Sequence, residues 1–509
     1  LARPTSAKLD ARADLKDVAA LARLAGTDPA PLLVLVGSSA SVTLEAPANE
    51  GTADTVRLNG TIESSKARGT FNAVANADLV ETLKLGFATT LRPGDLHQAL
   101  GAKGGVRLGN QVSIRLEGTL AGLPLSGGAM TGLTATGTIA ADPMELSGDN
   151  DSRVRVRDVK GTLDVRNGDL TANFDARIVG RDGTTGDGSV TMRTSATLPK
   201  EERPFSLGDT VIQLESVPTF IFELAGANGR IAEAALGATV DSQATLTTTG
   251  DDRRRLTMQL KSPFADARLP SASIESTLVE ISRGDDLEAS LTVSPQLGRE
   301  VLSVIHPIFA DISSSEKPIT LDVGPLTLPL EGDQAARLDG AADLEIGRVT
   351  LRSTDFGSRM LSLLGNQKTD SIPATFSPLK ITARKGVIEY SDFVMELGEQ
   401  ASTRARRKLI FDGKIDLAAD PPTVIGISAT FPAEWIKGSF KELDKVPPAL
   451  LDTIRPKVTF YGPLYDKSGK RIPLKTRIDP INLKDGLKPE AVPGLIKGIG
   501  DLINKNRDR

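Results

Sequence analysis

The stretch from Ile372 to Ala429 decides the fold: IPATFSPLKITARKGVIEYSDFVMELGEQASTRARRKLIFDGKIDLAADPPTVIGISA. In its second half every other residue is apolar or glycine: Leu409, Phe411, Gly413, Ile415 and Leu417. Successive side chains of a strand point to opposite faces, so this alternation predicts one apolar face and one mostly polar face. The same pattern precedes a polar, basic turn at residues 400–408. The stretch predicts antiparallel strands with one apolar side.

The segment has a further internal order of an apolar strand, a turn ending in glycine, an aromatic strand and Gly-Lys-Ile-Asp-Leu. These features occupy residues 379–381, 385–390 and 413–417. In this order the stretch resembles the C-terminal region of the AsmA-like family, which includes the TamB-type proteins of bacteria with two membranes. The resemblance spans about residues 206–440. It implies a long curved β-sheet whose concave apolar face carries lipid across the periplasm.

The N-terminal part of the chain shows the same alternation. Gly-Thr followed by a large apolar residue recurs there at unequal spacing, with the glycines at Gly60, Gly69, Gly118, Gly137 and Gly161. Unequal spacing excludes a fixed-period solenoid and favours a meander of hairpins, with these glycines expected at turns or bulges. We therefore predict a mainly β protein: an elongated, twisted antiparallel sheet that forms an open hydrophobic groove. A few short helices are expected at its ends and along its opening.

Four segments have helical patterns. Residues 10–25 show helical spacing with Asp14 as N-cap, and residues 216–246 predict two short helices, the first capped by Ser216, before a strand. Residues 296–312 predict a helix kinked at Pro307, and residues 490–505 an amphipathic one. We expect a β-rich segment at 1–205, an AsmA-like segment at 206–440 and an extension at 441–509. That extension carries 15 Lys and Arg against 9 Asp and Glu.

Composition narrows the function. The chain has 509 residues, no cysteine, only two histidines (His97 and His306) and 4% aromatic residues, with a net charge of −4. These counts disfavour thiol chemistry, multi-histidine metal sites and nucleic-acid binding. The paired carboxylates at 149–151, 251–252 and 285–286 lack calcium-loop spacing, so we interpret them as turns. No catalytic residue, metal site or cofactor is predicted.

The expected lipid-lining residues lie on the apolar faces of the alternating strands. They are Val112, Ile114, Leu116, Leu120, Leu170, Phe174, Ile178, Phe393, Met395, Leu397, Leu409, Phe411, Ile415 and Leu417. Hydrophobic contact is non-directional, so acyl chains held on such a face could slide along it. The competing interpretation is that these faces pair with one another or lie beneath helices as an ordinary closed core.

A second group of residues has two open interpretations. The basic cluster of Arg404, Arg406, Arg407 and Lys408 is either a solvated hairpin turn or a contact for anionic headgroups. Trp435 is either an interfacial anchor or a core residue. The C-terminal stripe containing Leu495, Ile496 and Ile499 either caps the last strands or binds a membrane.

These observations lead to a non-enzymatic function in lipid transport or outer-membrane assembly. The expected partners are phospholipid, the inner or outer membrane and other envelope proteins. We expect a periplasmic location, with an inner-membrane anchor upstream of Leu1. The alternative is a structural or adhesive surface protein built of β-sandwich domains of about 100 residues. A carbohydrate-processing β enzyme is disfavoured, because no carboxylate pair lies in a defined motif.

Overall fold

The protein is mainly β and divides into two compact units, Leu1–Pro263 and Phe264–Arg509. The computed structural model describes residues 9–20, 33–46, 55–76, 78–95, 106–124, 132–148, 153–180, 186–197, 206–225, 229–249, 253–275, 278–329, 335–352, 371–398, 407–430, 457–466, 472 and 474–478. The predicted boundary at residues 205/206 falls inside the first unit, between two strands that pair directly.

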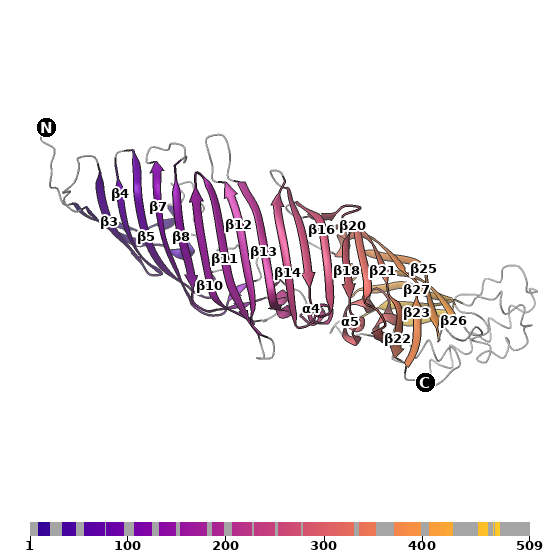
Figure 1. Cartoon of the computed structure of the whole chain (residues 1–509). Coiled ribbons are helices and arrows are strands. Elements are labelled where there is room, and N and C mark those ends of the chain that lie inside the picture. Colours follow the sequence, from indigo (N-terminus) through magenta and orange to yellow (C-terminus); the bar gives the residue numbers. More distant parts are fainter. Residues whose placement is uncertain are drawn as a thin grey trace, which may run out of the picture. The chain divides into compact units, whose positions relative to one another are not determined.

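The first unit is an antiparallel meander with short helical segments, and its long strands lie side by side in chain order (Figure 1). Its elements are β1 (Leu9–Leu15), β2 (Ala40–Ala46), β3 (Val56–Ser64), β4 (Ala67–Ala75), β5 (Leu79–Leu91), β6 (Arg107–Leu108), β7 (Val112–Pro124), β8 (Thr134–Ala141), β9 (Met144–Ser147), β10 (Arg153–Arg166), β11 (Asp169–Val179), β12 (Gly188–Thr197), β13 (Ser206–Pro218), η1 (Thr219–Ala225), α4 (Gly229–Leu236), β14 (Thr239–Thr248) and β15 (Arg253–Lys261).

Pairing in this unit follows the chain with one detour. The main sheet runs β1–β2–β3–β4–β5–β7–β8–β10–β11–β12–β13–β14–β15. β9 pairs with the first residues of β10, and β6 pairs with β9. Apart from β6 and β9, each strand of this unit pairs with the next strand along the chain.

The predicted helix at 10–25 is wrong in its first half. Leu9–Leu15 forms strand β1, paired residue by residue with β2. Alternating Leu9, Ala11, Ala13 and Leu15 fit a strand as well as a helix, and the neighbouring strand decides between them. Helical structure starts only at Val18, and Asp17 caps it by accepting a hydrogen bond from the Ala20 amide at 2.9 Å, in the role predicted for Asp14.

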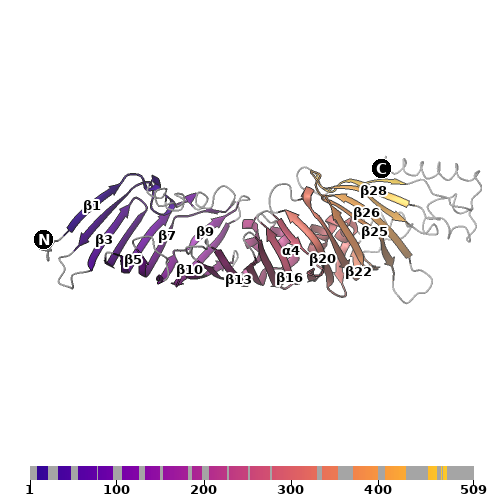
Figure 2. The same cartoon turned by 90° about the horizontal axis from the view of Figure 1, so that it is seen from above.

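The second unit is also antiparallel, and Figure 2 shows its strands from a second side. Its elements are β16 (Ala265–Glu275), β17 (Leu278–Ile281), β18 (Leu287–Leu291), α5 (Pro295–Glu300), η2 (Leu302–Val304), η3 (Pro307–Asp311), β19 (Ile312–Ser315), β20 (Ile319–Pro329), η4 (Ala335–Arg337), β21 (Asp339–Glu345), β22 (Gly347–Arg352), β23 (Ser371–Phe376), β24 (Leu379–Arg384), β25 (Val387–Leu397), β26 (Arg407–Asp416), β27 (Thr423–Thr430), β28 (Lys457–Pro463) and β29 (Lys475–Ile478).

Strand β25 is the branch point of the second unit. One edge pairs with β24 at its start and with β23 at its end, while the other edge pairs with β26 along both halves. One branch continues through β21 and β20 and the other through β22 and β19. The two branches bring apolar side chains together around α5, η2 and η3, where Leu297, Ile308 and Phe309 are buried.

Two of the other helix predictions fall within the described residues. Residues 216–246 contain η1, α4 and β14, as predicted, but Ser216 lies in β13 at a bulge, with φ of 51°, and does not cap η1. Residues 296–312 break into α5, η2 and η3, with Pro307 at the start of η3 instead of kinking one continuous helix. The segment 490–505 lies outside the described residues.

Candidate apolar surface of the first unit

One face of the first unit's sheet is apolar from end to end, and we call it the apolar face. Strand register aligns its central residues into a single row that crosses the sheet. The row is Ala13, Val42, Ile62, Gly69, Phe87, Leu116, Ile139, Gly161, Phe174, Met192, Ile212, Ala244 and Met258. Each residue lies directly opposite the next across a strand pair. The row therefore forms a continuous apolar path perpendicular to the strands.

The large side chains of this row are not buried. Phe87, Leu116, Phe174 and Met192 are half-buried, and Ile212 is 39% exposed. Full burial of such a side chain contributes about 1.5–3 kcal/mol, so leaving many of them open to solvent forgoes a large stabilisation. Extended exposed apolar surface in a folded protein marks a site that an apolar partner covers.

One end of the strands is covered. Val34 packs against Leu91, Leu108 and Val112, and the short strands β6 and β9 lie beside this cluster. A second cluster contains Val154, Val156, Ile178, Val217 and Val240, against which η1 packs Phe220, Ile221, Phe222 and Leu224. In Figure 1, α4 lies at the end of β14. These two clusters cover the apolar face at one end of the strands, and the central row stays accessible to solvent.

The turn at residues 33–37 is tied to the sheet by polar contacts. The Thr89 hydroxyl donates to the Leu35 carbonyl at 2.6 Å, and the Lys66 ammonium lies 3.4 Å from the Val34 carbonyl. Lys66 also pairs with Asp95 at 2.9 Å, with both side chains largely shielded. A shielded, hydrogen-bonded pair of this kind contributes more to local order than exposed pairs do, because its geometry is fixed and water screens it less.

The Gly-Thr dipeptides lie inside strands, so the prediction that their glycines occupy turns or bulges is wrong. Their register places glycine on the apolar face and threonine on the polar face. A Cβ on Gly161 would lie 2.8 Å from the Phe174 ring, and one on Gly69 would lie 3.1 Å from the Phe87 ring. Glycine therefore leaves room for an aromatic ring of the next strand to lie across it.

Bulges do occur, but at other residues. Register shifts lie beside Asp158 in β10, Ser216 in β13 and Asp392 in β25, and all three residues have positive φ. Asp tolerates the left-handed region because its short polar side chain can hydrogen-bond locally. Each shift restores the alternation, so the apolar face continues on the same side of the sheet beyond it.

The predicted lining residues of the first unit divide into two groups. Ile114, Leu116, Leu120, Leu170 and Phe174 are half-buried on the apolar face. Val112 and Ile178 belong to the covered clusters and are buried. Sequence reasoning missed other members of the same row, including Phe87, Met192 and Ile212. The available signal was their alternation, but only strand register shows that they continue the row.

The predicted lining residues of the second unit are enclosed, with one exception. Phe393, Met395, Leu397, Leu409, Phe411 and Ile415 have exposed fractions of 7% or less, and only Leu417 is half-buried. Phe309 of η3 contacts Phe393 edge-to-face at 5.8 Å between ring centroids, and Phe376 stacks on Phe393 at 5.3 Å. The short helices fill the space that an open surface would need, so these six residues form a closed core instead of the predicted open lining.

His306 lies in this core with an exposed fraction of 0%. Its Nδ1 accepts a hydrogen bond from the Ile308 amide at 3.1 Å, which caps η3, and its ring lies 4.8 Å from the Phe411 ring. His306 therefore packs between η3 and β26. His97 lies outside the described residues.

The glycines and Tyr390 of the family-like segment within residues 372–429 have structural roles in the second unit. Lys385 and Gly386, both with positive φ, form the tight turn between β24 and β25. Gly413 lies opposite Tyr390, where a Cβ would collide with the tyrosine ring. Burial, and secondarily the charge of Asp412, raise the pKa of Tyr390 well above its ordinary value.

Of the candidate headgroup contacts, Lys408 pairs with Glu396 across β25 and β26 at 2.9 Å. Arg407 is the first residue of β26. Arg404, Arg406, Trp435, Leu495, Ile496 and Ile499 lie outside the described residues, so both interpretations of those sites stay predictions.

Of the carboxylate pairs, Asp285 lies in the predicted turn, where its amide donates to the Ser282 carbonyl at 3.1 Å. The pairs at 149–151 and 251–252 lie outside the described residues.

The described residues hold no group of three or more His, Cys, Asp or Glu arranged to bind a metal ion. None of the helices described has the length and hydrophobicity needed to cross a membrane. Comparisons with protein-family models, curated proteins and solved structures found no match.

Proposed function

We propose that the apolar face of the first unit is a lipid-binding path along which acyl chains move between two membranes, without enzymatic chemistry. The observation that carries this proposal is the row from Ala13 to Met258, whose large side chains remain accessible to solvent. Acyl chains would cover this surface and supply the stabilisation that an internal core would otherwise provide. Headgroups would stay in water at the open strand ends.

The path would be passive. Contacts between acyl chains and aliphatic side chains have no preferred direction, so a chain can shift from one strand to the next without breaking directional bonds. The resemblance to AsmA-like proteins supports a periplasmic location and partners in the cell envelope. Consecutive pairing from β1 to β15 favours this function over a chain of sandwich domains of about 100 residues, each with its own closed core.

The test uses adjacent residues of β13. Ile212 lies on the apolar face and is 39% exposed, while Gln213 is exposed on the opposite face. Ile212→Glu places a charge on the path, and Gln213→Glu adds the same charge elsewhere. Transfer of a fluorescent phospholipid between donor and acceptor vesicles would be measured for the purified full chain, together with thermal unfolding.

We expect Ile212→Glu to fold and to lose at least tenfold in transfer rate, because an acyl chain cannot cover an ionised carboxylate without desolvating it. Gln213→Glu should retain the wild-type rate. Equal rates in all three proteins, or no phospholipid co-purifying with the wild type in native mass spectrometry, would reject the proposal.

A further inference from the structure

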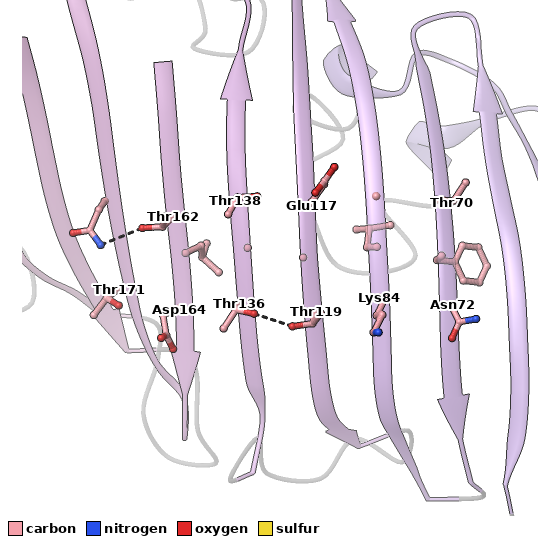
Figure 3. A pocket seen from close by; sticks show the side chains of 17 residues that line it. Thr70, Asn72, Lys84, Glu117, Thr119, Thr136, Thr138, Thr162, Asp164 and Thr171 are labelled. Atoms are coloured by element: carbon pink, nitrogen blue, oxygen red, sulfur yellow. Dashed lines mark hydrogen bonds between the residues drawn. The ribbon is translucent and has the colours of Figure 1, made fainter. Parts of the chain in front are cut away.

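The opposite face of the first unit's sheet, which we call the polar face, contains a hollow of about 840 Å³. It extends over β4, β5, β7, β8, β10 and β11 (Figure 3). Nothing in the lipid path uses this hollow, because alternation places its polar side chains on the other side of the sheet.

Strand register orders the polar side chains of the hollow into two parallel rows. The first row is Asn72, Lys84, Thr119, Thr136, Asp164 and Thr171. The second row is Thr70, Gly86, Glu117, Thr138, Thr162 and Asn173. Neighbouring strands lie about 4.8 Å apart, so each row presents a polar side chain at that repeat across the sheet, except at Gly86 in the second row.

The groups in these rows are mostly hydroxyls and amides, which both donate and accept hydrogen bonds. Thr119 and Thr136 share a hydrogen bond of 2.8 Å, and the Asn173 amide donates to Thr162 at 3.3 Å, as Figure 3 shows. These lateral bonds hold the side chains in position, and each hydroxyl keeps a further acceptor or donor site.

Charge in the hollow disfavours a polyanion. Its lining contains one cation, Lys84, and two carboxylates, Glu117 and Asp164. Asp164 also pairs with Arg166 at 3.0 Å, outside the hollow. A nucleic acid or polyphosphate would need an excess of positive charge that these residues do not supply.

We propose that this hollow binds a neutral, linear glycan lying across the strands. Sugar hydroxyls match the mixed donor and acceptor character of the rows, and successive sugars would meet successive strands. Because each hydrogen bond exchanged with water contributes little by itself, affinity must come from many bonds made together. The hollow therefore favours an extended chain over a single sugar.

The test is calorimetric titration of the full chain with cello-oligosaccharides of two to six sugars. We expect affinity to rise with length across this series. Thr138→Val/Thr162→Val removes two hydroxyls that face each other across β8 and β10, and valine preserves the shape and strand preference of threonine. Loss of these hydrogen bonds should weaken hexasaccharide binding about five- to tenfold.

Thr245→Val/Thr257→Val is the matched control. These threonines also face each other across a strand pair, β14 and β15, on the polar face beyond the hollow. This control should bind like the wild type. Equal weakening by both variants, absence of binding at every length, or preferential binding of heparin would overturn the proposal. Because the two faces are independent, Thr138→Val/Thr162→Val should leave phospholipid transfer unchanged whichever way the titration turns out.

Discussion

The two units are built from the same alternating strands but treat their apolar faces differently. In the second unit Phe393, Phe411 and Ile415 have exposed fractions of 0%, and Phe309 of η3 packs on Phe393. In the first unit Phe87, Leu116 and Phe174 stay half-buried, because η1 and α4 cover only one end of the strands. The difference teaches that helix placement, more than strand sequence, decides whether an apolar face becomes a core or a binding surface.

The largest expected effect is a difference in stability between the same substitution made at one phenylalanine of each unit. Phe411→Glu buries an unpaired charge in the second unit and should lower the free energy of unfolding by several kcal/mol, about 3–5, a large share of a typical total. Phe174→Glu leaves its carboxylate in reach of water and should cost about 1–2 kcal/mol, mainly lost packing. Calorimetry of the full-length variants compares the two. Similar losses at both positions would mean that the two faces are equally enclosed.

A smaller effect is expected at glycines against which an aromatic ring of the next strand packs. Gly161→Ala places a Cβ 2.8 Å from the Phe174 ring and should destabilise the first unit by about 1–3 kcal/mol. Gly86→Ala, whose Cβ would lie 3.5 Å from the Thr70 hydroxyl, is the control and should change stability by less than about 0.5 kcal/mol. Chemical denaturation measures both. If Gly161→Ala is also silent, the ring is free to move away and does not pack on the glycine.

The smallest expected effect concerns Tyr390 in the enclosed core. Its buried hydroxyl has no hydrogen-bond partner among the described residues, so Tyr390→Phe should be neutral or stabilising by up to about 1 kcal/mol at pH 7. Because burial raises the pKa of Tyr390 in the folded state, the unfolded chain ionises first, at its ordinary pKa of about 10. The wild type should therefore lose stability as pH rises above about 10.

Thermal unfolding at pH 7 and at several pH values above 10 tests this expectation. Tyr390→Phe lacks the ionisable group, so its advantage over the wild type should grow through the alkaline range. A constant difference between the two proteins at all pH values would show that the Tyr390 hydroxyl is solvated.

The sequence by itself predicted the mainly β, antiparallel class, since a period of two can be recognised within a single segment such as 409–417. It also located η1, α4 and the turn at Lys385–Gly386. It misassigned residues 10–15, where four alternating apolar residues suit either element and pairing with β2 decides. It also misplaced the Gly-Thr glycines, because glycine marks turns and close aromatic packing equally well.

Tertiary structure alone decided which apolar faces are enclosed. Alternation shows that Phe411 and Phe174 each lie on an apolar face, but not what covers that face, because the covering elements come from distant parts of the chain. η3 reaches Phe393 and Phe376 from more than sixty positions away in sequence. Register across many strands likewise created the row from Ala13 to Met258 and the polar hollow opposite it, since neither exists within any single strand.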